Sequence, residues 1–253
     1  MKFKELNFLT VGTAVLLALA AGKAAADDTN INTLTAAEKA AGWQLLFNGA
    51  NFNGWHCFNA TGINPGWVIK DGCMVCADPQ RAGDIVTGDE YSWFELQLDY
   101  NIAAAGNSGI LYHVTAENQN PRKPTWWTGP EFQLLNNVDG PDASPRQLSG
   151  WLYGLYKPPV DPATGQPIDA TKPAGQWNHV RLLVSPEKCE HDINGVKYFE
   201  YVLHSDDFNS RVAASKFASM PQFAKSDVGK IALQGDHGAI SFRNIKIRLI
   251  TAK

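Results

Sequence analysis

From residue 43 onward the sequence is a series of short apolar segments separated by Gly, Asn, Asp and Pro. In WFELQLDY (93–100) apolar and polar residues alternate. Because side chains two apart in a strand face the same way, this pattern predicts a strand with one buried and one solvated face. Further strands are predicted at WQLLFNG, GWVIKDGCMVC, SGILYHV, PEFQLLNN, NHVRLLVS, CEHDINGVKYFEY, GKIALQG and AISFRNIKIRLI. So many antiparallel strands do not form one flat sheet, and we expect an all-β, two-sheet antiparallel β-sandwich.

Two local signals support the all-β assignment. Asn194-Gly195, inside CEHDINGVKYFEY, is typical of a two-residue hairpin turn. In AISFRNIKIRLI the apolar residues change parity at Asn244, which predicts a β-bulge there. The proline-rich segment 157–175 is expected to be a loop, and loops of that length in compact domains are often functional.

The N-terminus has the features of a secretory signal peptide. Lys2 and Lys4 precede an apolar run at 8–21, and Ala24 and Ala26 fit an A-x-A cleavage site. The apolar run is too short to span a bilayer. We therefore expect residues 1–26 to be removed and the chain to be exported, either to the periplasm or out of the cell.

A short helix is predicted between this leader and the first strand. Thr35 is placed to cap it, Glu38 completes a capping box, and Gly42 ends it. The expected organisation is a signal peptide at 1–26, an N-terminal segment with one short helix at 27–42, and a single β-sandwich domain at 43–253.

Charge and aromatic content narrow the class of ligand. The chain has a net charge of −3, and the leader holds three lysines and one glutamate, so the exported form has about −5. With both signs scattered, this surface gives no electrostatic footprint for nucleic acid or for an anionic membrane. The eight Trp, twelve Phe and seven Tyr are ample for a core, with some left for a surface. In an exported protein that surplus favours carbohydrate as the partner, because sugar rings stack on aromatic faces.

The cysteines are Cys57, Cys73, Cys76 and Cys189. Export permits disulfides, so one or two bridges are compatible with the sequence, which does not define their pairing. Cys73 and Cys76 form a C-x-x-C, but DGCMVCAD is typical of a strand, where residues three apart face opposite sides. A second pair at zinc-site spacing is absent from the sequence, so we interpret these cysteines as structural.

The stretch GPEFQLLNN (129–137) carries an unusual polar pair. Glu131 and Gln133 project from one face of the predicted strand, and Phe132 and Leu134 project from the other. The polar face either points to solvent, as many strand exteriors do, or belongs to a sugar-binding or catalytic surface.

Seven segments follow one another in an order typical of one protein family. Over roughly residues 43–250 the chain resembles the 3-keto-disaccharide hydrolase domain family, whose fold is a concanavalin A-like jelly roll. The segments are LLFNGANFNGW, GNSGILYHV, GPEFQLLNN, SGWLYGLYKPP, GQWNHVRLLV, EHDINGVKYFEY and LQGDHGAISFRNIKIRLI. The resemblance implies substrates that are glycosides oxidised at C3.

A ketone at C3 changes how a glycosidic bond breaks. It acidifies the hydrogen on C2, so a base can expel the C1 oxygen through an enolate. Adding water to the resulting enone gives net hydrolysis, whereas stopping earlier makes the reaction that of a lyase. Such a site needs a base near C2, a donor or cation for the enolate oxygen, and an acid for the leaving group, and each proton-transfer group contributes ~10²–10⁴ in rate.

The resemblance implies that Glu131 and Gln133 belong to the site. Glu131 is expected to be the base or a ligand of a divalent cation, and Gln133 to bind hydroxyls. His237, in the glycine-flanked turn QGDHG, is the second expected catalytic residue, because histidine titrates near neutrality and suits either proton-transfer role. The alternative is that His237 only caps a tight turn that Asp236 initiates.

Five further residues are expected to bind substrate: Asn107, His113, Tyr153, Trp127 and Trp151. Asn107 lies in GNSGI, and many members of the family carry an arginine a few residues beyond this motif. His113 stands in that region and, six residues after Asn107, would face the same side of a regular strand. Tyr153 is suited to donate to the enolate oxygen or to stack on a sugar. Trp126 and Trp127 are adjacent, so at least one should line a surface or cleft. A turn is the structural alternative for Asn107, and core packing is the alternative for Tyr153.

Two other functions fit the predicted fold. A non-catalytic carbohydrate-binding module would use the tryptophans to hold a glycan and leave Glu131 in solvent. An ordinary glycosidase of this fold would need two or three acids in an E-x-D-x-x-E pattern, whereas EFQLLN has one. A divalent cation would stabilise the enolate, although no ligand set with clear metal spacing is visible in the sequence.

Overall fold

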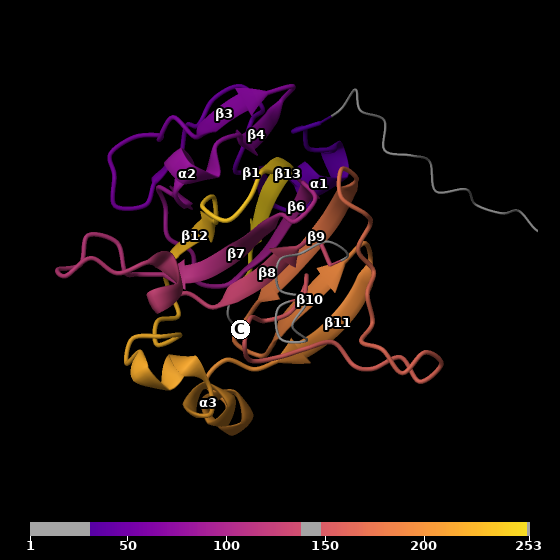
Figure 1. The fold of residues 1–253 in the computed structure, drawn as a ribbon. Coiled ribbons are helices and arrows are strands. Elements are labelled where there is room, and N and C mark those ends of the chain that lie inside the picture. The colour runs from indigo at the N-terminus through magenta and orange to yellow at the C-terminus, as the bar shows by residue number, and fades with distance from the viewer. Residues whose placement is uncertain (1–30, 138–147, 252–253) are drawn as a thin grey trace, which may run out of the picture. The chain divides into compact units, whose positions relative to one another are not determined.

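The computed structural model describes residues 31–137 and 148–251, which fall in one compact unit, Ile31–Lys253 (Figure 1). The predicted signal peptide lies outside the described residues. Two antiparallel sheets form the framework and confirm the predicted sandwich. The larger sheet has the order β11 (Val196–Tyr201), β10 (Cys189–Ile193), β9 (Trp177–Val184), β6 (Phe94–Ile102), β13 (Ile240–Leu249), β4 (Cys73–Cys76), β3 (Trp67–Lys70), and β1 (Trp43–Leu45) also pairs with β13. The smaller sheet has the order β2 (Trp55–Cys57), β5 (Ile85–Thr87), β12 (Lys230–Leu233), β7 (Asn107–Val114), β8 (Glu131–Leu135).

The hydrophobic core lies between the two sheets. Phe94, Leu96 and Leu98 of β6 contribute from the larger sheet, and Phe132 and Leu134 of β8 contribute from the smaller one, all without solvent exposure. In both strands, alternate side chains therefore enter the core as the sequence predicted. The opposite face of β8 is left free to carry polar side chains.

The predicted turn and bulge are both present. Asn194 and Gly195 join β10 to β11 with φ of 52° and 81°, the left-handed conformation that this hairpin turn requires. The register of β13 against β6 shifts between Arg243 and Lys246, and Asn244 has a φ of 55°. The bulge thus lets both halves of β13 direct their apolar residues into the core.

The predicted N-terminal helix is α1 (Ala36–Ala40), with the Thr35–Glu38 capping box formed. The structure adds helices that the sequence analysis did not predict, namely α2 (Pro79–Ala82), α3 (Asp206–Ala213), and the 3₁₀ turns η2 (Thr125–Trp127) and η3 (Lys216–Ser219). In α3 only Phe208 is buried, so the segment lacks the apolar stripe from which a helix is recognised. Among the described residues, no helix has the length and apolar character needed to cross a membrane.

Cys57, Cys73, Cys76 and Cys189 are all free and buried, so the bridges that the sequence allowed are not formed. Cys73 and Cys76 delimit β4, as the strand interpretation requires. Burial raises the pKa of the Cys76 thiol to about 12, and its Sγ–H donates to the Gly235 carbonyl at 2.9 Å. A thiol that stays protonated at neutral pH does not act as a nucleophile, which supports a structural role.

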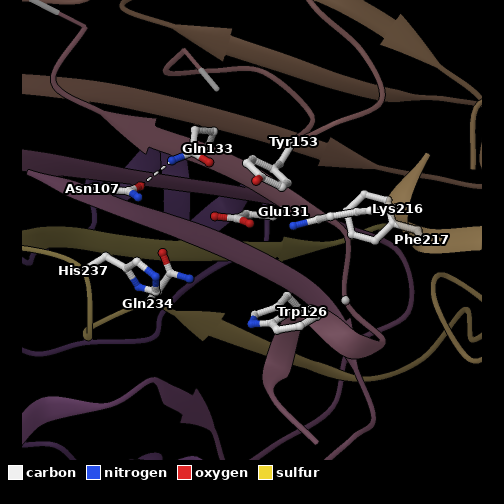
Figure 2. Close-up of a pocket in the computed structure, with 10 residues that line it drawn as sticks. Asn107, Trp126, Glu131, Gln133, Tyr153, Lys216, Phe217, Gln234 and His237 are labelled. Carbon is white, nitrogen blue, oxygen red and sulfur yellow. Dashed lines mark hydrogen bonds between the residues drawn. The ribbon is translucent and has the colours of Figure 1, made fainter. Parts of the chain in front are cut away.

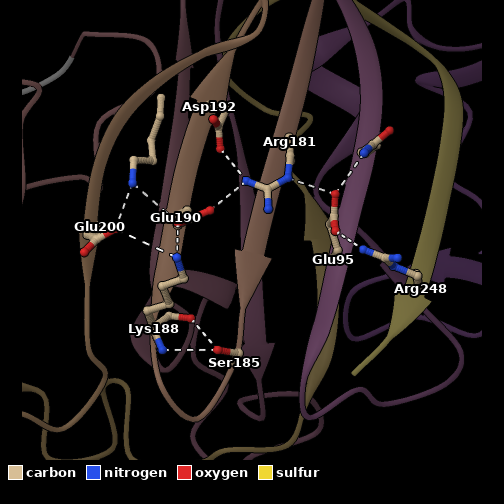
Figure 3. A network of polar contacts seen from close by, with 10 residues as sticks. Glu95, Arg181, Ser185, Lys188, Glu190, Asp192, Glu200 and Arg248 are labelled. Carbon is tan, nitrogen blue, oxygen red and sulfur yellow. Dashed lines mark hydrogen bonds and ion pairs between the residues drawn. The ribbon is translucent and has the colours of Figure 1, made fainter. Parts of the chain in front are cut away.

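A network of ion pairs covers the outer face of the larger sheet (Figure 3). Arg181 of β9 donates to Glu95 of β6 at 2.8 Å, and to Glu190 and Asp192 of β10 at 2.9 and 2.8 Å. Arg248 of β13 donates to the second oxygen of Glu95 at 2.6 Å. One guanidinium thus neutralises carboxylates on both neighbouring strands, and its planar fork suits several acceptors at once.

We expect Arg181→Met to lower the free energy of unfolding by about 2–3 kcal/mol, because three partly buried carboxylates lose their shared cation. Urea denaturation at pH 7 measures this change. Lys70→Met is the matched control: Lys70 is exposed on β3 of the same sheet and forms no ion pair among the described residues, so its loss should change stability little. Equal destabilisation by the two variants would contradict the network's role.

Candidate functional site

A pocket of about 230 Å³ lies on the face of the smaller sheet that points away from the core (Figure 2). Strands β7 and β8 form its floor, and η2, η3 and two loops form its walls. Its lining residues are Asn107, Trp126, Gly129, Glu131, Gln133, Tyr153, Lys216, Phe217, Gln234 and His237. The structure therefore brings together five of the predicted site residues: Glu131, His237, Asn107, Gln133 and Tyr153.

Strand register explains why these side chains meet. Leu111 of β7 pairs with Glu131 of β8, and Gly109 pairs with Gln133, so the polar face of β8 continues onto β7. Gly109 supplies the space for the acid: a Cβ at this position would lie 2.8 Å from the Glu131 Cγ. The Tyr153 N–H donates to the Glu131 carbonyl at 2.9 Å and holds Tyr153 beside the same strand.

Glu131 is buried at the centre of this pocket, rather than pointing to solvent. Burial raises the pKa of its carboxyl to about 8, and the nearby Asp84 carboxylate adds to the rise, while Lys216 and His237 oppose it. Within the described part of the chain, no group donates a hydrogen bond to this carboxylate. The acid is therefore mostly protonated at neutral pH, and it is a strong base once it loses its proton.

His237 faces the pocket from the loop between β12 and β13. Its Nδ1 pairs with the Asp236 carboxylate, and this hydrogen bond raises the pKa of the imidazole. Gly238 lets the loop approach the start of β7, since a Cβ there would lie 2.9 Å from the Asn107 backbone nitrogen. An imidazolium that persists to higher pH is suited to donate a proton.

Asn107 and Gln133 present complementary amide groups. The Gln133 Nε2–H donates to the Asn107 Oδ1 at 2.6 Å and to the Ser108 carbonyl at 3.2 Å. Among the described residues, the Asn107 nitrogen and the Gln133 oxygen have no further partner. The pair therefore offers one donor and one acceptor, as recognition of a sugar hydroxyl requires.

Lys216 is a pocket residue that the sequence analysis missed. Its Nζ lies 4.3 Å from the centre of the Tyr153 ring and 5.5 Å from that of Trp126. Aromatic faces hold an ammonium in this way without neutralising it. No periodic pattern marks Lys216, because η3 reaches the pocket from a distant part of the chain. Phe217, its neighbour in η3, was missed for the same reason, and Gln234, which directly follows β12, was not singled out although it lies in the QGDHG turn.

Trp126, rather than the predicted Trp127, lines the pocket. Both tryptophans lie in the 3₁₀ turn η2, where the alternation of a strand does not apply. Trp126 packs against the small outer cluster that includes Val86, while the Trp127 ring lies 4.0 Å from the Lys123 Nζ. One of the adjacent pair thus lines a cleft, and it is Trp126; Trp127, which the sequence analysis expected to bind substrate, is not among the lining residues.

His113 does not reach the pocket, contrary to the parity argument. The register of β7 against β12 is irregular here, and His113 has a φ of 51°, which breaks the alternation. Its buried ring bonds the Ser92 carbonyl at 2.7 Å and contacts Trp93 and Phe94.

Trp151 is also absent from the pocket lining. Its side chain is buried, and its contribution to the site is through the backbone: its carbonyl accepts from the Gln133 N–H at 3.0 Å. The 157–175 loop forms the short bridge Val160–Pro167 and likewise does not line the pocket.

The described residues do not assemble a metal centre. No group of three or more His, Cys, Asp or Glu side chains among them lies close enough to hold an ion. Among the described residues that line the pocket, Glu131 is the single carboxylate, and amides, aromatic rings, an imidazole and an ammonium surround it. This donor set does not fit the divalent cation considered from sequence, and we assign no step to one.

Comparison with known proteins confirms the resemblance inferred from sequence. The model of the 3-keto-alpha-glucoside-1,2-lyase-like domain family matches residues 42–248. A 3-keto-disaccharide hydrolase from Bacteroides thetaiotaomicron is 28% identical over 239 residues, covering 83% of this chain and 79% of that protein. A crystal structure from Parabacteroides distasonis, provisionally named glycosyl hydrolase, is 33% identical with a TM-score of 0.75, covering 87% of this chain and 100% of that one. A second crystal structure of that provisional name, from the same species, is 28% identical with a TM-score of 0.59, covering 82% and 99%.

Proposed function

This chain belongs to the 3-keto-alpha-glucoside-1,2-lyase-like domain family, and from that membership and the pocket we propose that it cleaves 3-keto-glycosides by elimination. A base removes the proton from C2, and the electron pair of that bond enters the enolate of the C3 ketone. Collapse of the enolate forms the C1–C2 double bond and breaks the bond from C1 to the glycosidic oxygen. The departing oxygen takes a proton, and addition of water to the enone completes hydrolysis.

Removal of the C2 proton, stabilisation of the enolate and protonation of the leaving oxygen each have a suitable group in the pocket. We assign the Glu131 carboxylate as the base for C2 and the His237 imidazolium as the acid for the leaving oxygen. The Lys216 ammonium is the candidate for stabilising the enolate oxygen, and Tyr153 supports it through its ring. Asn107 and Gln133 are the candidates for binding hydroxyls.

The observation that carries the proposal is the environment of Glu131. A carboxyl buried in a pocket with a pKa of about 8 is a far stronger base than one at a solvent-exposed strand face. A passive sugar-binding surface has no need of such a group. An ordinary glycosidase needs two carboxyl groups across the scissile bond, and the described pocket lining contains one.

Incubating the purified protein with a 3-keto-disaccharide and, separately, with its unoxidised parent tests the proposal. We expect sugar to be released from the ketosugar and not from the parent, because only the ketone acidifies the C2 hydrogen. Parallel reactions with chelator test the absence of a metal-dependent step. Release from the parent would establish an ordinary glycosidase, and binding without release from either would establish a carbohydrate-binding module.

We expect Gly109→Ala to lower kcat/KM by at least tenfold, because the added methyl group displaces the Glu131 side chain. Turnover of the 3-keto-disaccharide measures the loss of activity, and a thermal melt measures any change in stability separately. Gly62→Ala is the matched control, since a Cβ at that position meets nothing within 4 Å. Unchanged turnover in Gly109→Ala would show that the exact placement of this carboxylate is unimportant.

A further inference from the structure

Asp84 lies outside the pocket lining but connects two segments that contribute to it. It directly precedes β5, and its carboxylate accepts hydrogen bonds from the Thr125 hydroxyl and from the Gly235 N–H, the latter at 3.3 Å. Thr125 begins η2, which carries Trp126. Gly235 stands two residues before His237. One side chain therefore contacts both segments.

Hydrogen bonds fix the backbone at Asp84 and at the residue before it. The Asp84 carbonyl accepts from the Phe58 N–H at 2.8 Å, and the preceding Gly83 carbonyl accepts from the Trp67 Nε1–H at 2.9 Å. Gly235 packs against the Gly83 carbonyl so closely that a Cβ would collide with it. The carboxylate thus projects from a fixed point of the smaller sheet.

The hydrogen bond between the Asp84 carboxylate and Thr125 orients η2 and the turn that follows it. Thr125 is completely buried, and its carbonyl accepts from the N–H groups of Thr128 and Gly129 at 3.3 and 3.1 Å. Trp126 and Gly129, both in the pocket lining, therefore depend on how Thr125 is held.

We propose that Asp84 is a positioning residue that fastens the segments of Trp126 and His237 to β5 and thereby sets the position of both side chains in the pocket. The pKa of Asp84 is raised to about 6 by burial, so the group is charged at neutral pH. Its charge raises the pKa of His237, which also faces Asp236 and Glu131. Only the kinetic test of this positioning role rests on the proposed function, because the other tests use the substrate-free protein.

Two substitutions separate the two contributions of Asp84. Asp84→Asn removes the charge but keeps both contacts, because its amide oxygen accepts from Gly235 and its amide nitrogen donates to the Thr125 hydroxyl. Asp84→Ala removes the contacts as well. Asp89→Asn, an exposed acid just beyond the other end of β5, is the matched control.

Hydrogen exchange and NMR titration of the substrate-free protein provide readouts that do not need turnover. We expect Asp84→Ala to accelerate amide exchange at least tenfold in both segments, 125–129 and 234–238, and Asp84→Asn to leave it near the wild-type rate. The His237 imidazole, assigned by its loss in His237→Asn, should titrate at a lower pH in Asp84→Asn, because the Asp84 charge raises its pKa. With ketosugar, kcat should fall at least tenfold in Asp84→Ala and recover largely in Asp84→Asn.

Wild-type exchange in both segments of Asp84→Ala, or an unchanged His237 titration in Asp84→Asn, would overturn the proposal. If Asp84→Ala fails to fold, Thr125→Val replaces it: this variant should accelerate exchange in 125–129 while His237 titrates as in the wild type. Absence of ketosugar turnover in the wild type, together with the expected exchange and titration changes, would reject the proposed function and leave the positioning role established.

Discussion

Replacing Glu131 by glutamine is expected to lower kcat/KM toward a 3-keto-disaccharide by about 10²–10⁴, because an amide cannot accept the C2 proton. The change is nearly isosteric, and the pocket around residue 131 should keep its shape. Steady-state release of sugar by the purified variant measures the loss. Glu200→Gln, at an exposed carboxylate on β11, is the control and should retain wild-type activity. Full activity in Glu131→Gln would remove this residue from the chemistry even if the protein cleaves ketosugars.

The pKa of Glu131 gives this prediction a second readout. Because burial raises that pKa to about 8, the fraction of active base should rise about tenfold per pH unit below pH 8, and kcat/KM should follow it for as long as the His237 imidazolium keeps its proton. A group with a raised pKa in the folded state stabilises the fold below its unfolded value and loses that contribution as pH rises through its folded value. We therefore expect Glu131→Gln to melt at a higher temperature than the wild type at pH 8, with a smaller gain at pH 4. A loss of activity combined with a gain in stability excludes unfolding as its cause.

The sequence was informative wherever strand alternation holds. Phe132 and Leu134 enter the core, and Glu131 and Gln133 share the other face, because β8 is regular over its whole length. The same rule failed for His113, because a bulge in β7 reverses the parity that it assumes. The sequence around His113 contains no pattern that predicts a bulge. Around Asn244, by contrast, the apolar residues change parity, and this change is visible in the sequence itself.

Other parts of the site depend on tertiary structure. Trp126 and Trp127 are adjacent, and only the packing of η2 against Val86 decides which ring faces the pocket. Lys216 and Asp84 are separated from Glu131 by long stretches of chain and by chain reversals that no spacing rule describes. The family resemblance indicated Glu131 and His237 as candidates, but it did not indicate which charged groups shift their pKa values.

Replacing Lys216 by methionine is expected to lower kcat by about 10²–10³, with a smaller effect on KM, because the ammonium acts on charge that develops on the enolate oxygen only as the C2 proton leaves. Methionine keeps a flexible apolar chain of similar length against Tyr153 and Trp126. Lys216→Arg keeps the charge and should recover part of the rate. Kinetics with the 3-keto-disaccharide separate kcat from KM for each variant.

Lys123→Met is the matched control for this substitution, since Lys123 also lies over a tryptophan ring, that of Trp127, but outside the pocket lining. Its kinetics should equal those of the wild type. Lys216 also lowers the pKa of Glu131, so its loss should move the rising limb of the pH–rate profile toward higher pH. A change in KM alone, with kcat and the pH profile unchanged, would show that Lys216 binds the substrate without stabilising the enolate. In that case another group of the pocket would have to stabilise the charge on the enolate oxygen, and the Tyr153 hydroxyl is the next donor to test.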